Sequence, residues 1–172
     1  MFDKTKANDK DYVLKAVSRN VRPFTLQYAS LELRNDKDVV LAAINRNGYA
    51  LKYASDELKN DKDVVLAAVR ESGGALEYAS DEMKNNKYIV FVAVSKNGEA
   101  LRYASDELRN DKDIVFEAVK EAPWAIEHAS PELQNDEDII GVAGYGDEYY
   151  EDEEYNESNR GDDGDIGDDI EN

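Results

Sequence analysis

The chain contains no cysteine, a single histidine and no long apolar segment. Without cysteine, neither disulfides nor thiolate metal sites are available. Its first residues, Met1-Phe2-Asp3-Lys4, lack the apolar core of a secretion signal. No later stretch approaches the roughly 20 apolar residues that a membrane-spanning helix needs. We therefore expect a cytoplasmic protein, in the producing or the host cell, that does not associate with membranes.

The chain also has few basic residues compared with acidic ones. The chain has 21 Lys and Arg against 39 Asp and Glu, which gives a net charge of −18. Residues 145–172 hold 13 of the acidic side chains and one Arg, so this tail supplies most of the excess. Because nucleic-acid binding depends on Lys and Arg that neutralise phosphates, we expect no direct binding of nucleic acid.

A 25-residue unit, by contrast, is repeated about five times. Tyr-Ala-Ser begins at positions 28, 53, 78 and 103, and returns as His128-Ala129-Ser130. A fixed period of this length is typical of stacked helical arrays, in which no unit buries its apolar face alone. No strand-like alternation is present. We predict an all-α, solenoid-like helical-repeat domain over residues 1–144. The acidic tail, residues 145–172, is expected to be disordered without a partner, since it has few aliphatic residues to bury.

The copy at residues 60–84 illustrates the unit. Its apolar run predicts a longer helix, which Asn60 or Asp61 would cap. Positions that stay apolar in the other copies should face the core, and these are Val65, Ala68 and Val69. The position of Ala67 varies between copies and should face solvent. The invariant alanine at position 68 indicates a close helix–helix crossing.

The second half of the unit should contain a shorter helix and a capped turn. We expect the longer helix to end near Gly73, because glycine readily adopts the left-handed conformation that closes a helix. Leu76 and Ala79 would lie on the inward face of the shorter helix. Ser80 should cap the final turn, since in the last copy the serine is followed by Pro131, at the first helical position, where proline is well tolerated.

The unit A-L-x-Y-A-S-D-E-L-x-N-D-K-D-V-V-L-A-A-V resembles the repeats of a domain of unknown function, numbered 4116, over about residues 8–144. That family occurs in tandem in bacterial, algal and large-virus proteins, and no catalytic residues are assigned to it. The resemblance implies an all-helical array and no reaction. This chain departs from the pattern at Tyr88, which replaces the usual Asp, at His128, which replaces Tyr, and at Gly141 and Gly144.

We expect no catalytic, metal or cofactor site. His128 stands where other copies have a half-buried tyrosine, which favours a tolerated substitution. A hydrolytic triad would need an activated serine, but Ser130 belongs to a row of repeated caps. The segment Asp162-Asp163-Gly164-Asp165 lacks the spacing and the final Glu of a calcium loop.

Partner-binding positions are sought where the copies disagree and in the tail. The repeated tyrosines suggest either a stacking platform for bases or, as we favour, a seam between units. Trp124 should be partly exposed, as an interface anchor or as a packed end residue. The candidate partner-binding residues are Tyr49, Glu99, Trp124, His128, Asp147, Glu148, Tyr149, Tyr150, Glu151, Asp152, Glu153, Glu154 and Tyr155.

These features favour a non-enzymatic protein-interaction module whose partner is another protein with a basic surface. The alternative is an acidic inhibitor or nucleic-acid mimic that occupies the basic groove of a nucleic-acid-handling enzyme. The tail would then steer binding by its charge, or it serves only to keep the protein soluble.

Overall fold

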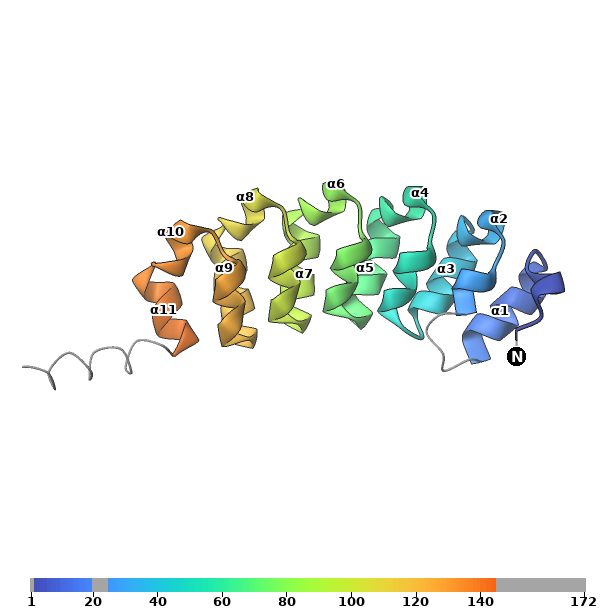
Figure 1. Ribbon diagram of the computed structural model, residues 1–172, viewed down its shortest axis with the longest axis horizontal. Helices are drawn as coiled ribbons and strands as arrows, with labels where there is room; N and C mark the ends of the chain where they lie inside the picture. Colours follow the sequence, from blue (N-terminus) through green and yellow to red (C-terminus); the bar gives the residue numbers. More distant parts are fainter. Residues whose placement is uncertain (1, 20–24, 145–172) are drawn as a thin grey trace, which may run out of the picture.

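The computed structural model describes residues 2–19 and 25–144. Every regular element in these ranges is helical, and the repeats form one curved row (Figure 1). The predicted all-α repeat array is confirmed. The expectation of a disordered tail and the candidate residues in it, Asp147 to Tyr155, lie outside the described residues.

Each repeat from Thr25 onward combines a 3₁₀-helix, a one-turn α-helix and a longer α-helix, whereas the first 3₁₀-helix of the chain is followed directly by a longer α-helix. The 3₁₀-helices are η1 (Lys4–Lys6), η2 (Thr25–Tyr28), η3 (Gly48–Tyr53), η4 (Gly73–Tyr78), η5 (Gly98–Tyr103) and η6 (Pro123–His128). The one-turn helices are α2 (Leu31–Arg34), α4 (Asp56–Lys59), α6 (Asp81–Lys84), α8 (Asp106–Arg109) and α10 (Pro131–Gln134). The longer helices are α1 (Lys10–Arg19), α3 (Lys37–Ile44), α5 (Lys62–Glu71), α7 (Lys87–Lys96), α9 (Lys112–Glu121) and α11 (Glu137–Ala143).

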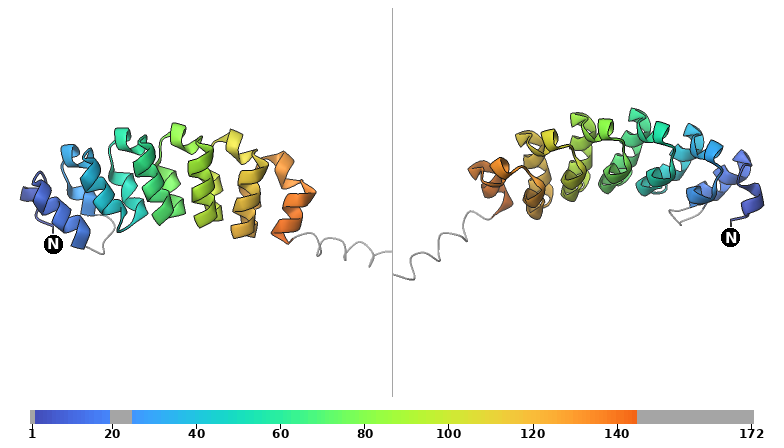
Figure 2. Two further views of the ribbon diagram at one scale, coloured as in Figure 1. Left: turned by 180° about the vertical axis from the view of Figure 1, so that it is seen from behind. Right: turned by 45° about the horizontal axis from the view of Figure 1, so that its top comes forward.

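Like elements of successive repeats are neighbours. Each longer helix contacts the longer helix of the next repeat, and each 3₁₀-helix from η2 onward contacts the next 3₁₀-helix. The one-turn helices line the upper edge of the row in Figure 1, and the row bends into an arch in Figure 2. The array therefore has two separate faces, one formed by the longer helices and the other by the 3₁₀-helices. We call them the helical face and the 3₁₀ face.

Side-chain caps fix the ends of these helices. Asp61 is the cap of α5, because its Oδ1 accepts hydrogen bonds from the amides of Asp63 and Val64 at 3.0 and 3.1 Å. Ser80 caps α6 by accepting from the amide of Met83 at 3.3 Å. Pro131 occupies the first turn of α10, as predicted. Of the two capping residues expected for the longer helix, the aspartate is therefore the one used.

The core follows the pattern shared by the copies. Val65, Ala68 and Leu76 are fully buried, and Ala79 nearly so, which confirms the predicted inward positions. Ala67 does not face open solvent as expected. It is half-buried against the core, because longer helices of the neighbouring repeats pack on both sides of α5.

The shorter helix of each unit is a 3₁₀-helix. Its tight winding shows in the bond from the amide of Ala79 to the carbonyl oxygen of Leu76, at 3.1 Å, which spans three residues. Side chains three residues apart eclipse one another in this geometry. Leu76 lies within η4, and Ala79 follows it as an extended cap residue whose side chain is also buried.

The expected role of the repeated glycine is wrong. The longer helix α5 ends at Glu71, and among the glycines of the described ranges only Gly144, which follows α11, has a positive φ, of 74°. Gly73 instead lies against the next repeat, where an added Cβ would collide with the main-chain carbonyl oxygen of Ala93. Gly48 and Gly98 stand in the same relation to the alanines of their following repeats. Close approach between repeats, and not a left-handed turn, therefore requires the glycine at these junctions.

Candidate functional site

A lysine clamp joins the longer helices of neighbouring repeats. Lys37 Nζ lies 2.8 Å from Asp61 Oδ2 and 3.3 Å from Asp63 Oδ2, both of the next repeat. The same clamp is formed by Lys10 with Asp36 and Asp38, by Lys87 with Asp111 and Asp113, and by Lys112 with Asp136 and Asp138. Its first aspartate is also the helix cap, so the clamp connects one repeat to the start of the next longer helix.

The clamp is missing between α5 and α7. Asn86 and Tyr88 occupy the two aspartate positions there, and Lys62 has no ion pair within the residues that the structure describes. Arg70 instead donates to the Tyr88 hydroxyl at 3.3 Å. The junction between α5 and α7, in the middle of the array, therefore lacks the two carboxylates of the clamp, and the charge of Lys62 is not paired there.

Exposed aromatic side chains lie at this junction and on the next longer helix. Tyr88 and Phe91 stand three residues apart on α7, so they share a helix face, and Phe116 has on α9 the place of Phe91. Their exposed fractions are 51%, 41% and 40%. We call these three residues the aromatic patch. The same position holds half-buried leucines in earlier repeats, such as Leu66, so larger rings here extend the surface outward.

Two of the predicted partner-binding residues, Tyr49 and Glu99, lie on the 3₁₀ face, and each contacts a side chain of the next repeat. The Tyr49 ring packs edge-on against Tyr78 with ring centres 6.4 Å apart. Glu99 Oε2 lies 3.3 Å from His128 Nε2, at the same separation along the sequence. An added Cβ on Gly74 would come within 2.6 Å of the Tyr49 hydroxyl. These variable positions therefore also contact the next repeat, and their role in binding stays a prediction.

Three of the four repeated tyrosines follow the expected seam, whereas Tyr28 is 44% exposed. Tyr53, Tyr78 and Tyr103 are partly buried against the core, and Lys52 Nζ lies 5.5 Å from the centre of the Tyr78 ring. Trp124, in η6, is 56% exposed, which confirms the predicted exposure. The repeated tyrosines thus help to hold the repeats together, whereas Trp124, at the repeat position of Tyr49 and Glu99, is open to solvent.

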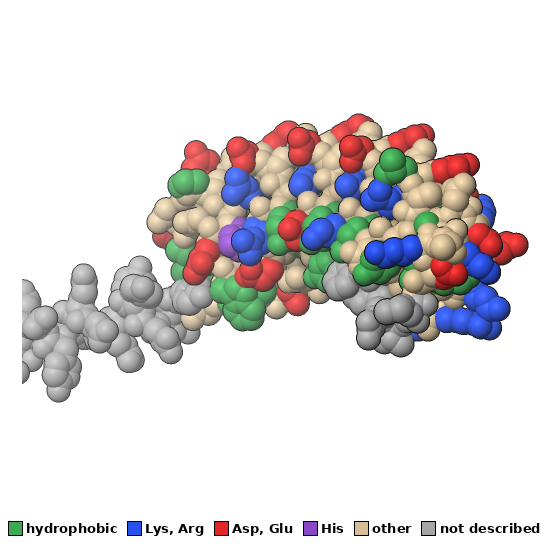
Figure 3. Space-filling view, turned by 45° about the vertical axis from the view of Figure 1, so that its right-hand side comes forward, with side chains coloured by type: hydrophobic (Ala, Val, Ile, Leu, Met, Phe, Trp, Pro, Cys, Tyr) green, Lys and Arg blue, Asp and Glu red, His purple; other side chains and the backbone are tan. Residues whose placement is uncertain are grey.

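Charged side chains form two rows along the one-turn helices. Figure 3 shows a row of acidic groups along the upper edge and a row of basic groups directly beneath it. The acids begin the one-turn helices, as Asp56 and Asp106 do, and the bases end them, as Lys59 and Arg109 do. Lys59 pairs with Asp56 at 3.4 Å, and Arg109 pairs with Asp106. These pairs are exposed and add little stability by themselves.

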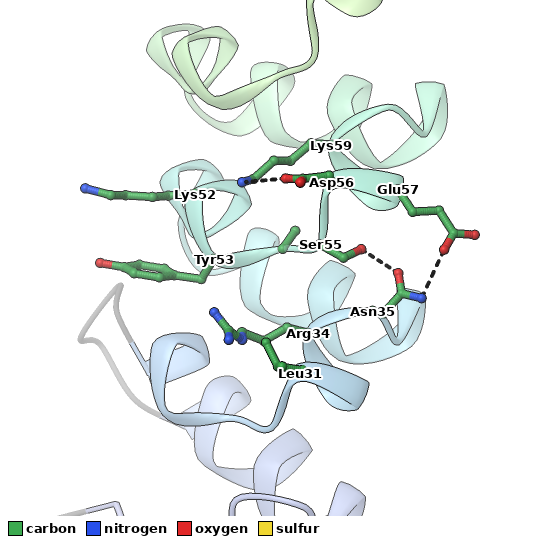
Figure 4. Close-up of a pocket in the computed structure, with 10 residues that line it drawn as sticks. Leu31, Arg34, Asn35, Lys52, Tyr53, Ser55, Asp56, Glu57 and Lys59 are labelled. Carbon is green, nitrogen blue, oxygen red and sulfur yellow. Dashed lines mark hydrogen bonds and ion pairs between the residues drawn. The ribbon is translucent and has the colours of Figure 1, made fainter.

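A pocket of about 500 Å³ opens between the first two one-turn helices (Figure 4). Its lining is mixed, with three cations, two carboxylates, one tyrosine and one leucine among its side chains. The lining residues are Leu31, Arg34, Asn35, Lys52, Tyr53, Ala54, Ser55, Asp56, Glu57 and Lys59. Sequence reasoning missed both this pocket and the aromatic patch. The Asp-to-Tyr change at position 88 and the Asp-to-Leu change at position 31 are the signals that point to them.

Together, these features define a helical-repeat protein of the solenoid class. The chain belongs to the family described as Domain of unknown function (DUF4116), whose model matches residues 9–59, 37–84, 86–134 and 111–141. The overlapping matches confirm tandem repetition. No curated protein and no solved structure matches the chain. Within residues 2–19 and 25–144, no helix has the length and apolar character to cross a membrane, and no three metal-binding side chains are grouped.

Acid is expected to weaken the junctions that carry the clamp. The Lys10 ammonium lowers the pKa of Asp36 below its ordinary value of 3.8. Burial alone would raise the pKa of Asp61, but hydrogen bonds from Lys37 and from main-chain amides lower it. A lowered folded-state pKa gives stability that is present above the unfolded value and is lost as pH falls through the folded value. Urea unfolding should therefore show a loss of stability below about pH 4.

The clamp can be rebuilt as a matched control. In a variant with Asn86→Asp and Tyr88→Asp, Lys62 regains two carboxylates. Between pH 7 and pH 3, this variant should lose more of its free energy of unfolding than the natural chain does. Equal losses in the two proteins would show that the clamp does not contribute to this pH dependence. The acidic tail is present in both, so its titration cancels in the comparison.

Proposed function

We propose that the protein is a non-enzymatic interaction module whose array binds another protein through the aromatic patch. The exposure of Tyr88 and Phe91 at the junction without a lysine clamp, and of Phe116 on the next longer helix, carries this proposal. Aromatic side chains dominate the energetics of protein interfaces. Exposed apolar clusters on a highly charged monomer are typical of binding sites.

The surroundings of the patch support an interface. Lys62 and Arg70 lie on α5, beside α7, and provide a polar rim of the kind that surrounds interface cores. Since the two clamp carboxylates are absent, a partner can approach without desolvating them. The tail, with a net charge of −12, would add attraction to a partner with a basic surface elsewhere on it.

The non-enzymatic part of the proposal rests on how nucleophiles are used. Each repeated serine both caps a one-turn helix and donates its hydroxyl to an asparagine of the preceding repeat, as Ser130 does to Asn110 at 2.6 Å. The single histidine is paired with Glu99. These side chains are engaged in building the array, so none is positioned as an activated nucleophile or its base.

Affinity capture from the natural host, with partners quantified by mass spectrometry, tests the proposal. The full chain with Phe91→Ala and Phe116→Ala should lose its partner at least about 10-fold, since an aromatic anchor contributes 2 kcal/mol or more. The matched control removes two exposed rings from the 3₁₀ face through Tyr49→Ala and Trp124→Ala. It should retain the partner.

The reverse result, loss only in the control, would place the interface on the 3₁₀ face and overturn the assignment to the aromatic patch. Retention by both double variants would show that neither aromatic site is used. Circular dichroism of each variant checks that the array is folded.

A second candidate is the acidic inhibitor or nucleic-acid mimic. The observation in its favour is the row of carboxylates at one-repeat spacing along the upper edge in Figure 3. The neighbouring basic row partly offsets this charge, which is why we place this function second. It would be supported by capture of a nucleic-acid-handling enzyme that survives both double variants and declines steeply with salt.

A further inference from the structure

Charge is graded along the chain. Residues 1–59 hold eleven Lys and Arg against eight Asp and Glu, whereas residues 60–144 hold nine against eighteen. The tail continues the trend with one against thirteen. The first two repeats are therefore the basic part of an otherwise acidic protein, and they contain the pocket shown in Figure 4.

Two cations of the pocket have no carboxylate partner. Arg34, Lys52 and Tyr53 project toward the same side of the ribbon (Figure 4). Within the described residues neither Arg34 nor Lys52 forms an ion pair, and the Arg34 Nε is buried without a hydrogen-bond partner. Both carboxylates of the pocket interact with other lining residues, since Glu57 accepts a hydrogen bond from Asn35 at 3.0 Å and Asp56 pairs with Lys59. Lys52 Nζ lies 5.5 Å from the centre of the Tyr78 ring, so this lysine has an aromatic contact but no carboxylate partner. With three cations against two carboxylates, the lining has a net charge of +1.

A departure from the repeat produces this surplus. Leu31 stands at the start of α2, where α4, α6 and α8 begin with an aspartate. In α8 that aspartate pairs with the arginine three residues later, and Leu31 cannot do the same for Arg34. Leu31 is 76% exposed. Leucine in place of aspartate removes a carboxylate from the pocket and puts an exposed apolar side chain at the same position.

We propose that this pocket binds an acidic, tyrosine-containing peptide, and that its occupant is the tail, residues 145–172, of a second copy of the chain. Carboxylates pair with Arg34, which can bind them bidentately, and with Lys52. A tyrosine ring packs against the exposed side chain of Leu31. The tail supplies both groups in the segment Tyr149 to Tyr155.

The position of the pocket favours a second copy as the source of the tail. It lies between the first two one-turn helices, whereas the described chain ends at Gly144, beyond the opposite end of the row (Figure 1). Association of the basic end of one copy with the acidic tail of another is a heterologous, head-to-tail contact. This inference is independent of the function proposed for the aromatic patch, which lies on the helical face.

The test is a titration of the full-length protein with a fluorescent synthetic peptide of residues 145–172. The variant with Arg34→Glu and Lys52→Glu should bind the peptide at least about 10-fold more weakly than the natural chain, since it loses charge-assisted hydrogen bonds. The matched control, Lys84→Glu with Arg102→Glu, makes the same charge change at the equivalent positions two repeats later. It should bind within about threefold of the natural chain, the modest effect of exposed charges.

Equal weakening in both variants would show attraction to the overall charge and would overturn the pocket, as would no binding by the natural chain. A peptide with Tyr149, Tyr150 and Tyr155 changed to serine has the same charge and should bind more weakly. Equal binding of that peptide would overturn the assignment to the tail, because any acidic segment would then serve. The single variant Lys52→Glu, at an exposed side chain, repeats the test if the double variant fails to fold.

Sedimentation velocity of the full chain distinguishes a second copy from the same copy. The natural chain should self-associate with rising concentration, and the Arg34→Glu, Lys52→Glu variant should remain monomeric under the same conditions. A natural chain that stays monomeric while binding the added peptide would overturn the assignment to a second copy.

Discussion

Replacing Leu76 by alanine is expected to lower the free energy of unfolding by about 2–5 kcal/mol, because the substitution leaves a cavity in a closed core. Leu76 is fully buried in η4. This 3₁₀-helix contacts α5 and α7 as well as η3 and η5. Since stacked repeats are stabilised by their nearest neighbours, one cavity weakens two junctions at once. Urea unfolding followed by circular dichroism measures the loss.

Leu31→Ala provides the same chemical change at an exposed position. Leu31 is largely open to solvent, so its replacement should alter the free energy of unfolding by no more than about 0.5 kcal/mol. A loss below that value for Leu76→Ala, or equal losses in the two variants, would contradict the burial of the 3₁₀ stripe. Comparison of the two leucines thus separates the cavity from any general effect of losing apolar surface.

The core could be predicted because the copies of the repeat within this one chain can be compared with each other. Positions that stay apolar in several copies, such as those of Val65 and Leu76, must serve the stack, and the structure confirms that they are buried. Caps were readable for a similar reason. The hydroxyl of Ser80 and the carboxylate of Asp61 act on amides two or three residues away, so local sequence contains the whole interaction.

Features that depend on the next repeat were predicted poorly. A glycine after a helix fits a left-handed turn as well as it fits a close contact, and only the contact of Gly73 with the carbonyl of Ala93, twenty residues later, decides between them. The 3₁₀ geometry was missed because residues three apart share a face in either kind of helix. Long-range packing therefore determined the details that local patterns left open.

The candidate sites likewise divide into those that local sequence predicts and those that depend on packing between repeats. Exposure of Trp124 followed from its place after the last turn, but the aromatic patch could not be read from the sequence. Phe91 and Phe116 align with leucines that are half-buried, so their apolar character resembles that of the core. The pocket requires Arg34 and Lys52, which belong to different repeats, to project to the same side. Only a structure brings these residues together.

Gly73→Ala is expected to destabilise the array by about 1–3 kcal/mol, as overpacking of a close contact does. The neighbour in its way is main-chain carbonyl oxygen, which cannot rotate aside as a flexible side chain can. The added methyl group therefore forces η4 away from α7 and opens the seam between two repeats. Thermal unfolding of the full chain, compared with the natural protein, measures this effect.

Gly141→Ala is expected to have the opposite sign. Gly141 lies inside α11, and nothing stands within 4 Å of the place where its Cβ would be. Alanine should therefore stabilise this helix by up to about 1 kcal/mol, the usual difference between the two residues in a helix interior. If Gly73→Ala also stabilised the protein, the close approach would be wrong and the glycine would be only a helix-ending residue. If the same Gly-to-Ala change destabilises the protein at position 73 and stabilises it at position 141, then the spacing between repeats is what excludes a side chain at position 73. That spacing is set by the contact between the glycine and the alanine of the next repeat.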